Sequence, residues 1–166
     1  DLFKEWREFE TPPLLNGAPD YSDKRFNNDQ IKYKELRNKL NKIKIDEWSI
    51  SNQIDWHIIR AEMNGYDFNF RILMPWKRDP AFYQTIWMRQ SDVPAHEGPT
   101  NHGVLEYWMY DIPLDENSKT KFLIEINSIT PFLHQAKNNL TGNAKDLWIA
   151  GIENFKQQRD NINEIK

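Results

Sequence analysis

The chain has 166 residues, a length typical of one globular domain with a single hydrophobic core. Its 22 basic and 25 acidic residues give a formal net charge of -3, and this acidic balance argues against a nucleic-acid partner. The absence of cysteine excludes disulfides, thiol nucleophiles and cysteine-ligated zinc, and no apolar run approaches the roughly 20 residues of a membrane span.

The first third of the chain predicts two helices separated by a turn. The segment 1–9 can form a short amphipathic helix, which Thr11-Pro12-Pro13 stops. Asn16-Gly17 marks a turn, and a second helix is expected from about Ser22 or Asp23 to about residue 43. The apolar side of this second helix comprises Phe26, Tyr33, Leu36, Leu40 and Ile43.

The segment 49–73 predicts a long central helix with two apolar stripes. At 100° per residue, one stripe comprises Ile50, Ile54, Ile58, Ala61, Gly65, Phe68 and Ile72. The second stripe, roughly opposite, comprises Trp56, Ile59, Met63, Tyr66, Phe70, Leu73 and Met74. A surface helix needs one apolar stripe, so two stripes predict a helix covered on both sides. We therefore expect the substitution Ile58→Asp to unfold the domain.

The second half predicts three more helices. Asp79 can cap a short helix from Pro80 to about Met88, and a loop is expected at 90–103. The segment 104–112 fits a helical turn or a strand equally well. A long helix from about residue 115 to 140 contains Pro131, where we expect a kink, and carries the apolar stripe Phe122, Ile126, Ile129, Leu133, Ala136 and Leu140. The last helix spans about 144–165, and its predicted inward side chains are Trp148, Ile152, Phe155 and Ile162.

These elements predict an all-α fold. It is a bundle of about five to six helices, with a long central helix at about 49–73 and an irregular loop at 90–114. No linker or second domain is visible, so residues 1–166 are interpreted as a single helical domain. The last helix has no evident cover, because a second apolar group on it, Leu147 and Ile165, lacks a predicted neighbour.

Polar residues of the central helix predict a structural network. His57, Arg60, Asp67 and Arg71 follow one strip of the helix, while Asp55 and Glu62 lie on another. Neither strip contains a nucleophile or an evident set of metal ligands. We therefore interpret Asp55, His57, Arg60, Glu62, Asp67 and Arg71 as paired structural charges and not as catalytic groups.

The loop 96–102, His-Glu-Gly-Pro-Thr-Asn-His, contains the strongest candidate for metal binding. A zinc-binding H-E-x-x-H helix places two imidazoles one turn apart, whereas here position 100 is threonine and Gly98-Pro99 break any helix. A loop could still gather His96, Glu97 and His102 around an ion, but a polar loop without metal is the favoured interpretation. The sequence thus predicts no metal site, no cofactor and no catalytic residue in this chain.

Three blocks of sequence carry a family resemblance. They are Ser51-Asn-Gln-Ile-Asp-Trp-His-Ile-Ile-Arg-Ala-Glu-Met-Asn-Gly65, Leu73-Met-Pro-Trp-Lys-Arg-Asp-Pro-Ala-Phe-Tyr83, and Ile129-Thr-Pro-Phe-Leu-His-Gln-Ala-Lys-Asn-Asn-Leu140. In order and spacing they resemble the N-terminal region of the bacterial DUF885 family, a domain of unknown function whose members are similar to zinc metallopeptidases. The resemblance implies long, mostly helical, exported proteins, either periplasmic proteins or lipoproteins. It also implies an H-E-x-x-H-like helix far C-terminal of these blocks, and this chain contains no such helix.

Two hypotheses for function follow. The resemblance implies a helical N-terminal module of a zinc-dependent, peptidase-like hydrolase, which packs against the C-terminal catalytic region of the same polypeptide and has no catalysis of its own. Zinc would then belong to the full-length parent. The residues expected to contact substrate or partner are Trp76, Arg78, Asp79 and Tyr83, although each also has a local structural explanation. The alternative is a stand-alone helical binding module that recognises another protein through an apolar groove.

Overall fold

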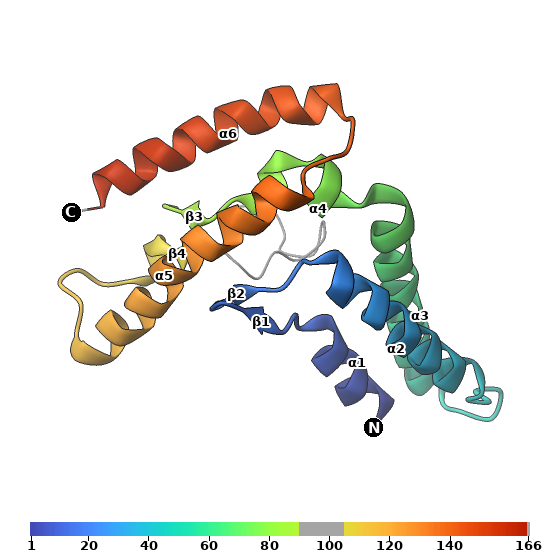
Figure 1. Cartoon of the computed structure of the whole chain (residues 1–166). Helices are drawn as coiled ribbons and strands as arrows, with labels where there is room; N and C mark the ends of the chain where they lie inside the picture. The colour runs from blue at the N-terminus through green and yellow to red at the C-terminus, as the bar shows by residue number, and fades with distance from the viewer. Residues whose placement is uncertain (90–104, 166) are drawn as a thin grey trace. The chain divides into compact units, whose positions relative to one another are not determined.

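The computed structural model describes residues 1–89 and 105–165, and its helices make the fold all-α, as predicted (Figure 1). Contacts within the chain define two compact units. Unit 1 contains Asp1–Pro12 and Tyr21–Met74, and unit 2 contains Pro13–Asp20 and Pro75–Lys166. The sequence predicts one domain without a linker. In the structure the chain passes between the two units before Pro13, after Asp20 and after Met74.

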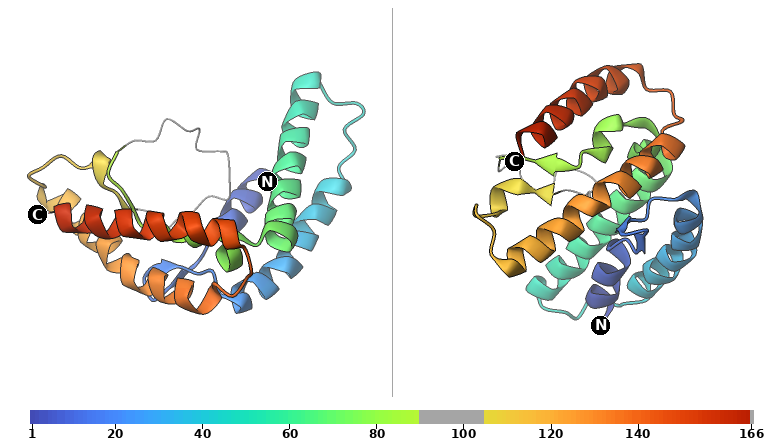
Figure 2. Two further views of the ribbon diagram at one scale, coloured as in Figure 1. Left: turned by 90° about the horizontal axis from the view of Figure 1, so that it is seen from above. Right: turned by 60° about the vertical axis from the view of Figure 1, so that its left-hand side comes forward.

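Unit 1 consists of three helices packed around one core. α1 (Leu2–Glu10), α2 (Asp23–Asn41) and α3 (Ile50–Phe68) begin at side-chain caps, since Asp1, Ser22 and Ser49 each accept a hydrogen bond from a backbone N–H of the first turn. α2 and α3 run in opposite directions, joined by residues 42–49 (Figure 2). The core between the helices consists of Trp6, Leu36, Leu40 and Met63, with Leu2, Phe9, Tyr33, Ile43, Trp56, Ile59 and Tyr66 packed around it.

The structure corrects the prediction that both stripes of α3 are covered. The second stripe faces the core through Met63, which is fully buried, and through Trp56, Ile59 and Tyr66. The first stripe is exposed: Ile50, Ile54, Ile58, Phe68 and Ile72 have exposed fractions between 50% and 76%. Helical period shows which side chains share a face, but it does not show whether another element covers that face. We call Ile50, Ile54, Ile58, Ala61, Gly65, Phe68 and Ile72 the open stripe.

The end of the central helix lies where the sequence predicts it. α3 continues as one π-helical turn, η1 (Asn69–Leu73), and Met74 then adopts a left-handed conformation with φ of 45°. A residue before proline is disfavoured in the right-handed helical region, so Pro75 prevents Met74 from extending the helix. This boundary also separates unit 1 from unit 2.

Unit 2 begins with a hairpin and continues with short elements. Strands β1 (Leu14–Leu15) and β2 (Ala18–Pro19) pair antiparallel around Asn16 and Gly17, whose φ values of 55° and 85° suit a tight two-residue turn. α4 (Pro75–Arg78) and η2 (Pro80–Tyr83) follow, and then β3 (Ile86–Trp87) pairs in parallel with β4 (Leu105–Glu106). The helix predicted from Pro80 to Met88 is therefore wrong beyond Tyr83.

The remainder of unit 2 consists of η3 (Tyr107–Met109) and two long helices, α5 (Glu116–Asn139) and α6 (Lys145–Glu164). The segment 104–112 is thus part strand and part helical turn over its described residues. Asp115 caps α5, which continues as a helix through Pro131. The predicted stripe of α5 faces the core, because Ile129 and Ala136 are buried and Phe122, Ile126 and Leu133 pack around Ile86 and Leu105.

Candidate functional site

α6 is held to its unit by a close contact at a glycine. A β-carbon placed on Gly151 would lie 2.5 Å from Cβ and 2.8 Å from Cγ of Pro80. Only glycine lets α6 approach η2 this closely, because any β-carbon would overlap the proline ring. Gly142, in the connection from α5 to α6, is similar: its β-carbon would lie 2.8 Å from the carbonyl oxygen of Lys77. These two glycines fix the first half of α6 on the α4–η2 turn.

A buried polar cluster holds the second half of α6. The Gln158 side-chain oxygen accepts hydrogen bonds from the backbone N–H of Thr85 at 2.5 Å and from its hydroxyl at 2.7 Å. Gln158 in turn donates to Asn154 at 2.7 Å, and Asn154 donates to Gln84 at 3.1 Å. Both Thr85 and Gln158 are buried. Buried polar groups need partners, so this cluster specifies which side of α6 faces the unit.

The structure consequently corrects the predicted orientation of α6. The sequence predicts Trp148, Ile152, Phe155 and Ile162 as inward side chains, but Trp148, Ile152 and Ile162 are exposed. The packed side of the helix contains Gly151 and Gln158 instead. Figure 1 shows α6 running back from the α4 end of the unit toward the C-terminus. We call its exposed apolar residues the outer face of α6: Leu147, Trp148, Ile149, Ile152 and Ile162.

A groove of about 360 Å³ with a mainly apolar lining lies along this helix. Lys156 and Arg159 line one part of it, paired at the surface with Glu153 at 2.6 Å and with Asp160 at 2.8 Å. We call this site the α6 groove; its lining residues are Pro80, Leu140, Trp148, Ile152, Phe155, Lys156 and Arg159. A concave apolar surface with a few charged groups at its margin is suited to binding an apolar segment of a partner.

The residues predicted to contact substrate or partner lie in or between α4 and η2, the segment against which α6 packs. Tyr83 is fully buried, and its hydroxyl donates to the Trp76 carbonyl at 3.0 Å and accepts from Asn139 at 2.9 Å. Asp79 caps η2 by accepting from the Ala81 N–H at 2.9 Å. Trp76 is also buried, while Arg78 lies beside Gly142. These positions give Tyr83 and Asp79 local structural roles, and a contact with substrate stays a prediction.

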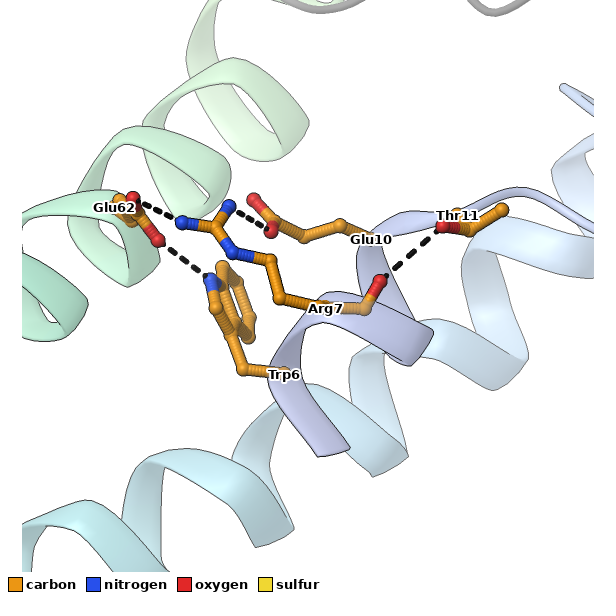
Figure 3. A network of polar contacts seen from close by, with 5 residues as sticks. All are labelled: Trp6, Arg7, Glu10, Thr11 and Glu62. Carbon is orange, nitrogen blue, oxygen red and sulfur yellow. Dashed lines mark hydrogen bonds and ion pairs between the residues drawn. The ribbon is translucent and has the colours of Figure 1, made fainter. Parts of the chain in front are cut away.

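Glu62, on the flank of α3, joins two helices of unit 1. Figure 3 shows its carboxylate facing both Trp6 and Arg7 of α1. The Trp6 indole N–H donates to one oxygen at 3.0 Å, and the Arg7 guanidinium donates to the other at 2.7 Å. Arg7 also pairs with Glu10 at 2.8 Å, and burial raises the pKa of Glu10 against the opposing effect of the Arg7 charge. This part of the predicted network positions α1 and has no catalytic arrangement.

The other predicted network residues are distributed along α3. Arg71 donates two hydrogen bonds to Asp67 one turn earlier, the first of them at 2.6 Å. The Arg60 guanidinium lies over the Trp56 ring, 5.3 Å from its centroid, and the His57 and Trp56 rings form a T-shaped contact with their centroids 4.9 Å apart. Asp55 and His57 are exposed. The structure thus divides the six residues among separate local contacts and does not gather them at one site.

A charged cluster in unit 1 was not predicted from the sequence. Arg25 is buried, lies over the Phe26 ring at 5.0 Å, and forms an ion pair of 2.6 Å with Asp29. Asp29 also accepts from the Tyr66 hydroxyl at 3.4 Å, and burial followed by the Asp29 charge raises the pKa of Tyr66. The i, i+4 spacing of Arg25 and Asp29 in the first turns of α2 was the available signal.

Neither a metal site nor a membrane span is found in the parts of the chain that the structure describes. Within 1–89 and 105–165, no three His, Cys, Asp or Glu side chains lie close enough to hold a metal ion. No helix in the same ranges has the length and hydropathy needed to cross a membrane. His96, Glu97 and His102, the candidate metal ligands of the loop, lie outside the described residues.

No family model matches the chain, and no curated protein or solved structure matches it.

Proposed function

We propose that this chain is a non-catalytic helical module of a zinc-dependent, peptidase-like hydrolase. In this proposal the outer face of α6 and the α6 groove pack against the C-terminal catalytic region of the same polypeptide. The observation that carries the proposal is the side of α6 that is left exposed. Its large apolar side chains stay partly or largely exposed, whereas a glycine and a glutamine occupy the buried side.

Burial energetics support a partner for this face. Four of the five outer-face residues, Leu147, Ile149, Ile152 and Ile162, are large aliphatic residues that are at least two-fifths exposed. Covering aliphatic surface contributes about 25 cal/mol per Å², so a docked segment would stabilise the assembly by several kcal/mol before the entropic cost of ordering it. Exposed apolar patches of this kind mark interaction sites in soluble proteins.

The positive charges of the α6 groove favour a partner segment that carries carboxylates. Lys156 and Arg159 line the α6 groove beside its apolar residues, and among the described residues no acidic side chain lines it. An apolar helix that carries carboxylates near one end would match this arrangement. The resemblance of the blocks 51–65, 73–83 and 129–140 to DUF885 proteins supports a catalytic region as the occupant.

The first test is the reading frame downstream of residue 166 in the encoding gene. We expect an open frame that encodes an H-E-x-x-H helix, and chelator-sensitive peptide hydrolysis by the full-length product but not by the isolated chain. An immediate stop codon, or chelator-sensitive hydrolysis by the isolated chain, would contradict the proposal.

The second test compares two substitutions in the full-length protein. Ile152→Asp changes the outer face of α6, whereas Ile124→Asp changes a somewhat more exposed isoleucine on α5 that does not line the groove. We expect Ile152→Asp to lower the melting temperature of the full-length protein while leaving that of the isolated chain unchanged. Ile124→Asp should leave both unchanged.

A further inference from the structure

The open stripe of α3 is a second exposed apolar face, in a different unit from α6. Its five large side chains are at least half exposed, which corresponds to roughly 500 Å² of apolar surface. That area reaches the upper part of the range of about 300–600 Å² for the largest patch of a typical monomer. The charged residues between Ile50 and Ile72 all fall on other sides of the helix, so the stripe itself contains only apolar residues.

We propose that the open stripe pairs with the open stripe of a second copy of this chain, with the two α3 helices antiparallel. A two-fold axis beside residue 63 would place Ile54 opposite Ile72, Ile58 opposite Phe68, and Ala61 opposite Gly65 of the second copy. Such an interface is isologous, since each contact occurs twice. The pairing is independent of the proposed role of α6.

The order of side-chain sizes supports this register. From Ile54 the stripe advances by 4, 3, 4, 3 and 4 residues to Ile72, which is the spacing of a short helix–helix seam. Large residues occupy both ends of the seam and the two smallest, Ala61 and Gly65, occupy its centre. In the antiparallel register, small residues therefore meet small residues and large ones meet large ones, so the helices can approach closely along the whole seam.

Gly65 independently supports the close approach of a second helix. A β-carbon at this position meets nothing within 4 Å, so no close contact with the described part of the chain requires glycine here. Glycine inside a helix costs about 1 kcal/mol relative to alanine. Close approach of a second helix at Gly65 would account for it, as Pro80 accounts for Gly151 within unit 2.

Charges beside the seam suit the same arrangement. On one flank, Arg60 of each copy would face Asp67 of the other, which places opposite charges together. On the other flank, the acid nearest the centre is Glu62, and its two oxygens are engaged by Trp6 and Arg7 within its own copy. Neither flank therefore brings two unpaired like charges together at the two-fold axis.

The area is sufficient for a weak dimer. Two copies would bury about 1,000 Å² from the large side chains of the stripe alone, close to the lower limit of about 1,200 Å² for specific interfaces. Side chains beside the stripe add to this value. We therefore expect a reversible, concentration-dependent dimer.

The test is sedimentation equilibrium of the isolated chain over a range of concentrations. Ile58→Asp introduces a charge into the seam, and Ile31→Asp is the matched control, because Ile31 is an isoleucine on α2 of the same unit that is at least as exposed as Ile58. We expect wild type to dimerise, Ile58→Asp to weaken the dimer at least about tenfold, and Ile31→Asp to match wild type. Circular dichroism should show that both variants remain folded. A wild type that stays monomeric, or equal effects of the two variants, would overturn the pairing.

Orientation is tested with disulfides, since the chain has no cysteine of its own. In the proposed register Ile54→Cys of one copy meets Ile72→Cys of the other, whereas two Ile54→Cys positions lie about 27 Å apart at 1.5 Å per residue. Under mild oxidation, a mixture of the two variants should form the mixed disulfide and neither variant should dimerise covalently alone. Covalent dimers of each variant alone would indicate parallel helices and contradict the antiparallel register, and so would the absence of any disulfide.

Discussion

Gly151 of α6 lies so close to Pro80 of η2 that a β-carbon on the glycine would come within 2.5 Å of the proline Cβ. This contact explains how α6 can be attached while its large apolar side chains remain exposed. It also allows a direct test with two glycine substitutions.

We expect Gly151→Ala to destabilise unit 2. Overpacking at a tight contact costs about 1–3 kcal/mol, which should exceed the gain of about 1 kcal/mol from better helix propensity. Gly65→Ala is the control, because Gly65 also lies within a helix but has open space around its β-carbon. Thermal unfolding of dilute protein should show a lower midpoint for Gly151→Ala and an equal or higher one for Gly65→Ala. A Gly151→Ala variant as stable as wild type would show that α6 can move away from Pro80 at little cost.

Gln158→Ala should also destabilise unit 2. The substitution leaves the buried N–H and hydroxyl of Thr85 without the oxygen they share, at a cost of about 1–3 kcal/mol. The neighbouring substitution Gln157→Ala is the matched control, since Gln157 is exposed. Chemical denaturation should separate the two variants, and equal midpoints would mean that water replaces the lost hydrogen bonds.

The two stripes of α3 should respond differently to charge. We expect Met63→Asp to unfold unit 1, because Met63 is fully buried in its core and an unpaired buried carboxylate costs several kcal/mol. Ile58→Asp should leave the melting temperature of the dilute monomer nearly unchanged, since Ile58 is half exposed. This expectation reverses the one drawn from the sequence. Loss of cooperative unfolding in Ile58→Asp would show that the stripe is covered within the monomer.

That reversal shows where prediction from sequence succeeds in this chain and where it fails. The starts of α2 and α5 were predictable because Ser22 and Asp115 provide local capping hydrogen bonds. The residues that share the core-facing stripe of α3 were predictable from the helical period. The open stripe has the same period, so the period did not show which of the two stripes is covered. Whether a helix face is buried depends on elements distant in sequence, and the helical period contains no information about them.

The α6 groove illustrates the same limit. Pro80, Leu140 and Ile152 line it from three separate segments. The sequence predicts large apolar residues as the inward side of α6, but Gly151 and Gln158 occupy that side. Pro80 leaves room only for glycine at position 151, and Thr85 needs the hydrogen-bond acceptor that Gln158 provides. Only tertiary contact reveals these requirements.

The ion pair of Asp67 and Arg71 should add stability that depends on pH. The hydrogen bonds from Arg71 lower the pKa of Asp67 below its ordinary value of 3.8. Because the folded pKa is the lower one, the contribution is fully present above the unfolded pKa and is lost as pH falls through the folded pKa. The melting-temperature difference between wild type and Arg71→Gln should therefore be larger near neutral pH than at about pH 3. A difference that stays constant across this range would contradict the assignment.

Cysteine labelling at position 152 tests the central claim, that the outer face of α6 is a docking surface for the remainder of a larger protein. In the isolated chain, Ile152→Cys should react rapidly with a thiol reagent, because the position is half exposed and no other cysteine competes. In the full-length protein we predict labelling at least about tenfold slower, while Ile124→Cys should react at the same rate in both. Equal labelling of Ile152→Cys in the isolated chain and in the full-length protein would contradict the account.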